Sequence, residues 1–161
     1  MSVYLSVAPP DGFAKWGDAE WDRWLREHPW EAAERACSRG DWAIFLYQLR
    51  AHAPLGARKL EPFLEQLVNE RPISSNDSAD LREALAIARD ELSRVPAAAL
   101  RGSNRAGFAS AEDLEAMIAG AAARMGKDPT VADVWTEVLD LVDRVLGNAA
   151  GQQRGVYFGH V

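Results

Sequence analysis

The chain has 161 residues, of which 48% are hydrophobic and 26% are charged, with 1 cysteine and a formal net charge of −6. This length and composition exclude a disordered segment and favour one globular domain, and a single cysteine excludes an internal disulfide. Because the sequence has neither a secretory signal nor an apolar run near the roughly 18 residues that span a bilayer, we expect a cytoplasmic protein.

The two ends of the chain are predicted to be strands. Val3, Leu5 and Val7 alternate with less apolar residues, which is the period-2 pattern of a half-buried strand. Residues 155–161 are also rich in β-prone side chains. We therefore expect a small two-stranded sheet formed by the N- and C-terminal segments and covered by helices, because an isolated ribbon is marginal in water.

Five of the 6 tryptophans lie close together near the N-terminus. They are Trp16, Trp21, Trp24, Trp30 and Trp42. Each buried indole removes about 150–250 Å² from water, so we expect the tryptophan-rich helical part, residues 18–53, to supply the heaviest part of the core. The alternative is an aromatic cage or stacking platform for a ligand, but helical spacing of the rings favours packing.

Three short helices are predicted in this part, over residues 18–27, 29–39 and 42–53. The His28-Pro29 pair ends the first, because the residue before a proline avoids the helical region. Gly40 suits the left-handed position that follows the second helix. Asp18 and Asp41 are the expected N-caps of the first and third helices.

Two amphipathic helices are predicted in the middle of the chain. After a break at residues 54–56, apolar spacings of 3, 4, 7 and 8 predict a helix from Leu60 to Val68, with Pro62 in its first turn. Residues 73–77 form a polar loop that also caps the next helix. That helix is predicted over residues 78–95 and ends where a proline follows.

Residues 97–109 are predicted to be a flexible loop, because small and turn-forming residues surround two arginines. The alternative is an anion-binding loop in which Arg101 and Arg105 face a phosphate or carboxylate. The segment lacks the Gly-Lys-Ser/Thr ending of a P-loop.

An acidic helical part, residues 110–147, follows this loop. Two aspartates lie three residues after a serine or threonine and resemble capping boxes. Helices are predicted over residues 110–125 and 130–146, with Gly126 and Gly147 as their end signals. The whole chain is thus predicted to be mainly α, a compact bundle of about seven helices in one domain.

Eight acids and three bases lie between residues 108 and 148, so this quarter of the chain carries nearly all of the net negative charge. Such a surface repels nucleic acid and attracts basic proteins. We expect the partner-binding surface to contain six of these acids, namely Asp133, Glu137, Asp140, Glu112, Asp113 and Glu115.

Catalytic and metal-binding motifs are not found in the sequence, and no cofactor is indicated. One cysteine and three scattered histidines match no zinc motif, and no HExxH or GxSxG pattern occurs. Cys37 with His28 or His52 is a formal nucleophile pair, but on an apolar helix face Cys37 is expected to be a small buried hydrophobe. His52 lies near a helix C-terminus, where the dipole should favour it.

Three functions are compatible with these features. The favoured hypothesis is a non-catalytic protein–protein interaction module, a small acidic inhibitor or immunity-type protein of bacterial origin that binds a basic partner. The alternative is a protein that binds a small anionic ligand through Arg101, Arg105, Trp24 and Trp30. An enzyme without a recognisable motif ranks last, and neither nucleic acid nor a membrane is expected as a partner.

Overall fold

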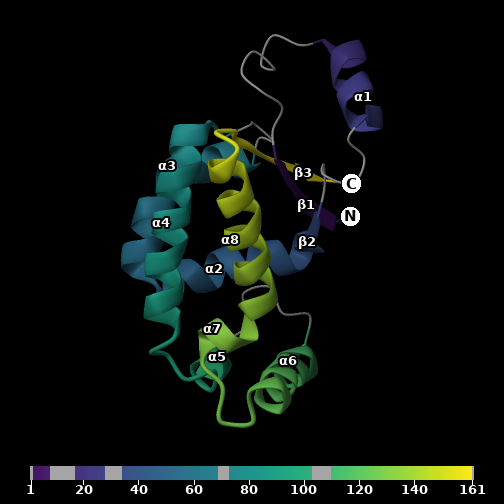
Figure 1. The fold of residues 1–161 in the computed structure, drawn as a ribbon. Helices are drawn as coiled ribbons and strands as arrows, with labels where there is room; N and C mark the ends of the chain where they lie inside the picture. Colours follow the sequence, from purple (N-terminus) through teal and green to yellow (C-terminus); the bar gives the residue numbers. More distant parts are fainter. Residues whose placement is uncertain (1, 8–16, 28–33, 69–72, 103–109, 161) are drawn as a thin grey trace.

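The computed structural model describes five stretches of the chain, residues 2–7, 17–27, 34–68, 73–102 and 110–160 (Figure 1). In these stretches the helices are α1 Asp18–Glu27, α2 Arg39–His52, α3 Pro54–Val68, α4 Ser75–Leu92, α5 Ala99–Gly102, α6 Ala111–Met125, α7 Val131–Val134 and α8 Thr136–Gly151. The strands are β1 Ser2–Val7, β2 Glu34–Ser38 and β3 Val156–His160. The mainly helical fold class is confirmed, although the described residues form one helix and one strand more than expected.

Strand β1 is the middle strand of an antiparallel sheet in the order β2–β1–β3. Val3 and Leu5 are fully buried, in keeping with the alternating pattern of this strand. They pair with His160 and Phe158 of β3, so the two ends of the chain lie side by side (Figure 1). On its other edge β1 pairs with β2, with Val3 opposite Cys37 and an irregularity after Val3.

Strand β2 replaces the second half of the helix predicted over residues 29–39, and that prediction is wrong there. Residues 34–38 pair along β1, and tertiary pairing of this kind overrides a weak local helix preference. Gly40 consequently lies in the first turn of α2, whose N-cap is Ser38 rather than Asp41. The Asp41 amide donates to Ser38 Oγ at 3.0 Å.

Helix α3 begins at Pro54 rather than Leu60, so the predicted break is wrong. Proline has no amide hydrogen, but an amide at the first helical position would have no partner within the helix, so proline is tolerated there. Glu91 of α4 accepts the amides of the next two residues at 3.1 and 2.8 Å, which satisfies donors that a helix N-terminus leaves open. Gly56 allows the close approach, because a Cβ there would lie 2.4 Å from the Ala88 Cβ.

Helix α4 also begins earlier than predicted, because Ser74 rather than a later residue is its N-cap. Immediately before it, Ile73 exchanges two backbone hydrogen bonds with Val156 at 2.8 and 3.0 Å. The predicted polar loop at residues 73–77 is therefore divided between a bridge to the sheet and the first turn of α4.

The segment over residues 97–109 is only partly a loop. Ala97 donates to the Pro129 carbonyl, and the Val131 amide donates to the Val95 carbonyl, both at 2.9 Å. Helix α5 follows at once, and residues 103–109, with Arg105, lie outside the described residues.

The helix predicted over residues 130–146 is divided at Trp135, which ends α7 and precedes α8. Trp135 is 2% exposed, so its large ring is buried at the junction between the two helices. Helix α8 then continues past the predicted end at Gly147. One face of α8 stays buried on both sides of Gly147, and it contains Val142, Leu146 and Ala149. Packing of this face against the core explains why the helix continues.

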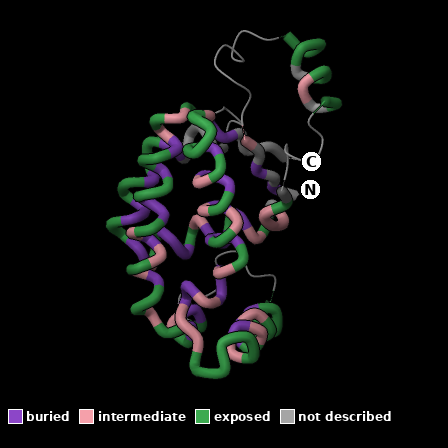
Figure 2. Tube along the Cα trace, viewed as in Figure 1, coloured by how far each residue is buried: buried purple, intermediate pink, exposed green. Residues whose placement is uncertain are grey.

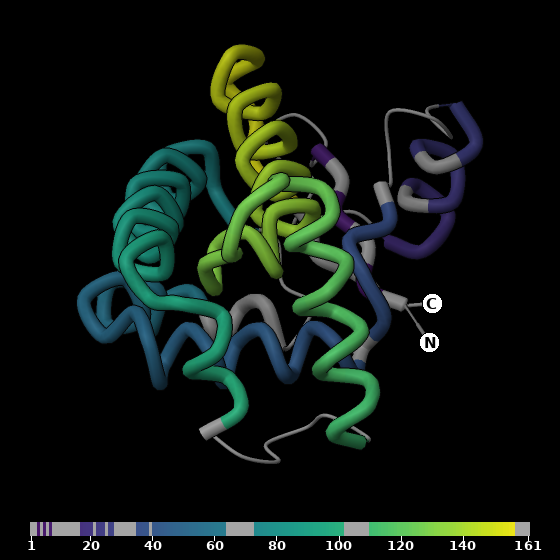
Figure 3. The backbone as a smooth tube through the Cα atoms, turned by 90° about the horizontal axis from the view of Figure 1, so that it is seen from below, coloured from purple at the N-terminus to yellow at the C-terminus, as the bar shows by residue number. Residues whose placement is uncertain are grey.

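Helix α4 lies between α3 and α8, and α8 lies across the sheet, while α2 runs behind α4 and α8 in the view of Figure 1 (Figures 1 and 3). The inward sides of these elements are buried and their outer sides exposed (Figure 2). The largest fully buried apolar side chains are Val3, Leu5, Phe45, Leu49, Ile73, Leu81, Leu92, Leu100, Val131 and Leu146. The core is thus spread over the whole bundle rather than concentrated in the tryptophan-rich part.

Helix α1 lies apart from these layers, at one end of the molecule (Figure 1). Its Trp24 is half-buried, and the guanidinium carbon of Arg154 lies 4.8 Å from the centre of its ring. This cation–π contact joins α1 to the turn between α8 and β3. Of the five clustered tryptophans, Trp42 is the one that the described residues place in the core, while Trp16 and Trp30 lie outside them.

Candidate functional site

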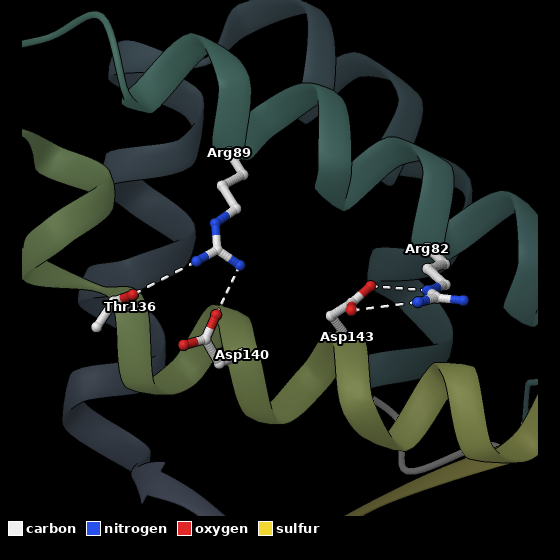
Figure 4. A network of polar contacts seen from close by, with 5 residues as sticks. All are labelled: Arg82, Arg89, Thr136, Asp140 and Asp143. Atoms are coloured by element: carbon white, nitrogen blue, oxygen red, sulfur yellow. Dashed lines mark hydrogen bonds and ion pairs between the residues drawn. The ribbon is translucent and has the colours of Figure 1, made fainter.

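Asp140, one of the predicted partner-binding acids, forms an ion pair with α4, and its side chain is 59% exposed. Arg89 Nη1 lies 2.6 Å from its Oδ1, and the same guanidinium reaches Thr136 Oγ1 at 3.4 Å (Figure 4). Along the same seam Arg82 donates to both carboxylate oxygens of Asp143 at 2.7 and 3.2 Å. These contacts join α8 to α4, and the two arginines neutralise the charges of Asp140 and Asp143.

The pKa values along this seam agree with the geometry. The hydrogen bonds from Arg82 hold the pKa of Asp143 below its ordinary value, with a further contribution from the charge of Arg89. Each pair is about half exposed, so its contribution to stability is small, about 1 kcal/mol or less. The two ion pairs therefore join α8 to α4, while their side chains stay about half exposed.

Asp133 and Glu137 lie near the α7–α8 junction. The carboxylate of Asp133 accepts the amide and hydroxyl of Thr130 at 2.8 and 3.0 Å, and so completes the predicted capping box. Glu137 lies 3.8 Å from Arg124 of α6 and its side chain is 80% exposed. Asp133 is therefore committed to helix capping, whereas Glu137 is loosely paired and accessible.

Glu115 forms a two-point ion pair with Arg101, at 2.5 and 2.8 Å. The hydrogen bonds lower the pKa of Glu115 and raise that of Arg101. Arg101 is thus already engaged by α6. Trp24 lies on α1, at the opposite end of the molecule from α5 (Figure 1), so the structure does not bring together the two described members of the predicted anion site.

The outward side of α6 has a different character. Glu112, Ala116, Ala119 and Ala123 are all exposed, and their spacing places them in one row along the helix. We call this row the outer α6 face. Leu114, Ile118 and Ala121 point the other way and are buried. The helix begins at Ser110, whose Oγ accepts the Asp113 amide at 3.1 Å, and ends at Gly126 with a φ of 65°, both as predicted.

The charges on this part of α6 are less compensated than those along the α4–α8 seam. Among the described residues, Glu112 makes no ion pair, and neither does Asp128 in the turn that follows the helix. Asp113 accepts a hydrogen bond from the Ser110 hydroxyl at 2.9 Å and remains exposed. Sequence reasoning identified these acids by composition but missed the row of exposed alanines between them.

Cys37 lacks the surroundings of a nucleophile. Burial, with a smaller contribution from the nearby charge of Asp41, raises its pKa to about 12. His52 is at the far end of the 14-residue helix α2, which is about 20 Å away, so the two cannot form a dyad. No group of three metal-ligating side chains occurs within the stretches that the structure describes.

His52 should make stability depend on pH. Burial lowers its pKa, so the unfolded chain takes up the proton more readily than the folded one. The free energy of unfolding therefore has its full value above pH 6.5, which is the pKa of His52 in the unfolded chain. It decreases as the pH falls below that value, because the unfolded chain then binds the proton. We expect the urea midpoint to fall between about pH 7.5 and 5.5 and the variant His52→Gln to lose part of that dependence. Equal slopes for both proteins would contradict this assignment.

Comparisons with models of protein families, with curated proteins and with solved structures found no match to this chain. No helix in the described parts of the chain is both long and apolar enough to cross a membrane. Among the described residues, the outer α6 face combines a row of exposed small side chains with an acid that makes no ion pair.

Proposed function

We propose that the protein is a non-catalytic protein–protein interaction module, a small acidic inhibitor or immunity-type protein that binds a basic partner through the outer α6 face. The supporting observation is a row of exposed alanines that runs along α6 from an unpaired glutamate. Side chains as small as Ala116 and Ala119 allow another helix to approach closely, since the distance between packed helices depends on the side chains at the contact.

The charge distribution supports a basic partner. Glu112 and Asp113 lie at the start of α6, and Asp128 lies just beyond its end, so acids are found at both ends of the alanine row. The overall charge of −6 adds long-range attraction, which mainly raises the association rate and makes it sensitive to salt. Of the other predicted acids, Glu137 is accessible, while Asp133, Asp140 and Glu115 are engaged within the chain.

A matched pair of double variants tests this surface. Glu112→Lys with Ala119→Trp reverses the unpaired charge and blocks the alanine row. Asp80→Lys with Ala86→Trp makes the same chemical changes at exposed positions of α4, where Asp80 also makes no ion pair among the described residues. The two variants have the same net charge. A difference between their binding affinities therefore reflects the outer α6 face and not the overall charge of the protein.

The binding partners are tested as a panel of purified basic enzymes by biolayer interferometry, at low and at high salt. We expect at least one enzyme to bind the wild type, and the α6 variant to bind it at least about 10-fold more weakly, which corresponds to about 1.4 kcal/mol. The α4 variant should bind like the wild type. Equal weakening by both double variants would show that net charge alone matters and would reject the α6 surface.

A further inference from the structure

An arginine of the chain itself already occupies one carboxylate of α6. Arg101 belongs to the short helix α5, which its neighbour Leu100, at 1% exposure, anchors in the core. Its guanidinium crosses from α5 to α6, which lie next to each other in the fold (Figure 1). There it donates to both carboxylate oxygens of Glu115, at 2.5 and 2.8 Å. The contact shows that Glu115 can bind a guanidinium at two points.

Glu115 lies on the margin of the outer α6 face. It follows Glu112 by three residues and precedes Ala119 by four, so these three side chains lie on one side of the helix. Among the described residues Glu112 makes no ion pair, whereas Glu115 is paired from within the chain. The proposed partner-binding face therefore has one open acid and one acid that Arg101 covers.

The covering ion pair is open to solvent and can be exchanged. The side chain of Arg101 is 52% exposed and that of Glu115 is 50% exposed. Ion pairs in contact with water contribute little to stability, because water solvates the two separated charges well. The hydrogen bonds from Arg101 lower the pKa of Glu115, so the carboxylate is ionised at neutral pH. An arginine from outside the chain can thus replace Arg101 at small cost, because it forms the same two hydrogen bonds.

We propose that Arg101 is an autoinhibitory contact, which covers Glu115 in the free protein and gives way to an arginine of the basic partner. This inference rests on the proposed function and adds that the partner presents a guanidinium to α6. Arginine is favoured over lysine because its planar guanidinium bonds to both carboxylate oxygens at once, as Arg101 does. Arg101 opposes binding in two ways, since it fills the site and its charge repels the incoming cation.

The substitution Arg101→Gln tests this contact, and Arg82→Gln is the matched control. Arg82 forms the same kind of two-point pair with Asp143, also about half exposed, but between α4 and α8. Each variant removes one positive charge and frees one carboxylate. The probe is a fluorescein-labelled, alanine-based helical peptide with arginine at every third or fourth position. Fluorescence anisotropy measures the affinity of this peptide for the wild type and for both variants.

We expect the peptide to bind Arg101→Gln about 3- to 5-fold more tightly than the wild type, which is the gain that one more exposed charge pair allows. Arg82→Gln should bind it less than about 2-fold more tightly, because only the long-range charge changes near α6. A peptide with lysine in place of arginine should lose most of the gain. Equal tightening by both variants would overturn the autoinhibitory contact alone, whereas absence of binding to all three proteins would overturn the proposed function as well.

A second measurement uses the wild-type protein and does not depend on a variant folding. The Nε–H signal of Arg101 is followed by ¹⁵N-edited NMR while the arginine peptide is added. We expect this signal to move toward the position of a free arginine side chain, because Glu115 exchanges Arg101 for the peptide. A signal that stays unchanged at saturating peptide would show that Arg101 keeps its place and would reject the proposal.

Discussion

Replacing Gly56 by alanine is expected to lower the free energy of unfolding by about 3 kcal/mol. The added Cβ would lie 2.4 Å from the Ala88 Cβ, 2.5 Å from its Cα and 2.6 Å from its backbone nitrogen. Backbone atoms cannot rotate away, so α3 and α4 would have to separate. Separation would also weaken the hydrogen bonds from the first amides of α3 to Glu91.

The same substitution at Gly120 is the control and should have the opposite sign. Gly120 lies inside α6, and the nearest atom to a new Cβ is the flexible Arg124 Nη1 at 3.7 Å. Alanine in a helix interior is favoured over glycine by up to about 1 kcal/mol. Urea unfolding followed by circular dichroism measures both changes. A Gly56→Ala protein as stable as the wild type would show that α3 and α4 do not pack this closely.

The start of α3 illustrates what sequence patterns can and cannot predict. Local rules identified Ser110 and Gly126 as the limits of α6, because capping and a left-handed glycine depend on residues within one turn. The first turn of α3 depends instead on Glu91, 35 residues later, and on contact with Ala88. Strand β2 was missed for the same reason, since its pairing partner β1 is distant in the sequence.

The candidate surface was predictable only in outline. Counting charges identified an acidic quarter of the chain, but the pairing of Asp143 with Arg82 spans 61 residues and cannot be inferred from composition. His52 shows a conflict between two local effects. Its place at a helix C-terminus suggested a favourable dipole, yet burial dominates and lowers its pKa.

Replacing Phe45 by alanine is expected to lower the free energy of unfolding by about 3–5 kcal/mol. Phe45 is 1% exposed and packs between two indole rings, with centroid distances of 5.4 Å to both Trp42 and Trp135. Its removal leaves a cavity that two rigid rings fill poorly. Since small domains are stable by only about 5–15 kcal/mol, this loss is a large share of the total.

Tyr47, on the opposite side of the same helix, is the matched control. It is 43% exposed, so Tyr47→Ala should change stability by no more than about 0.5 kcal/mol. Urea unfolding followed by tryptophan fluorescence compares the two variants. Equal effects would mean that the inner face of α2 is not packed against the α7–α8 junction.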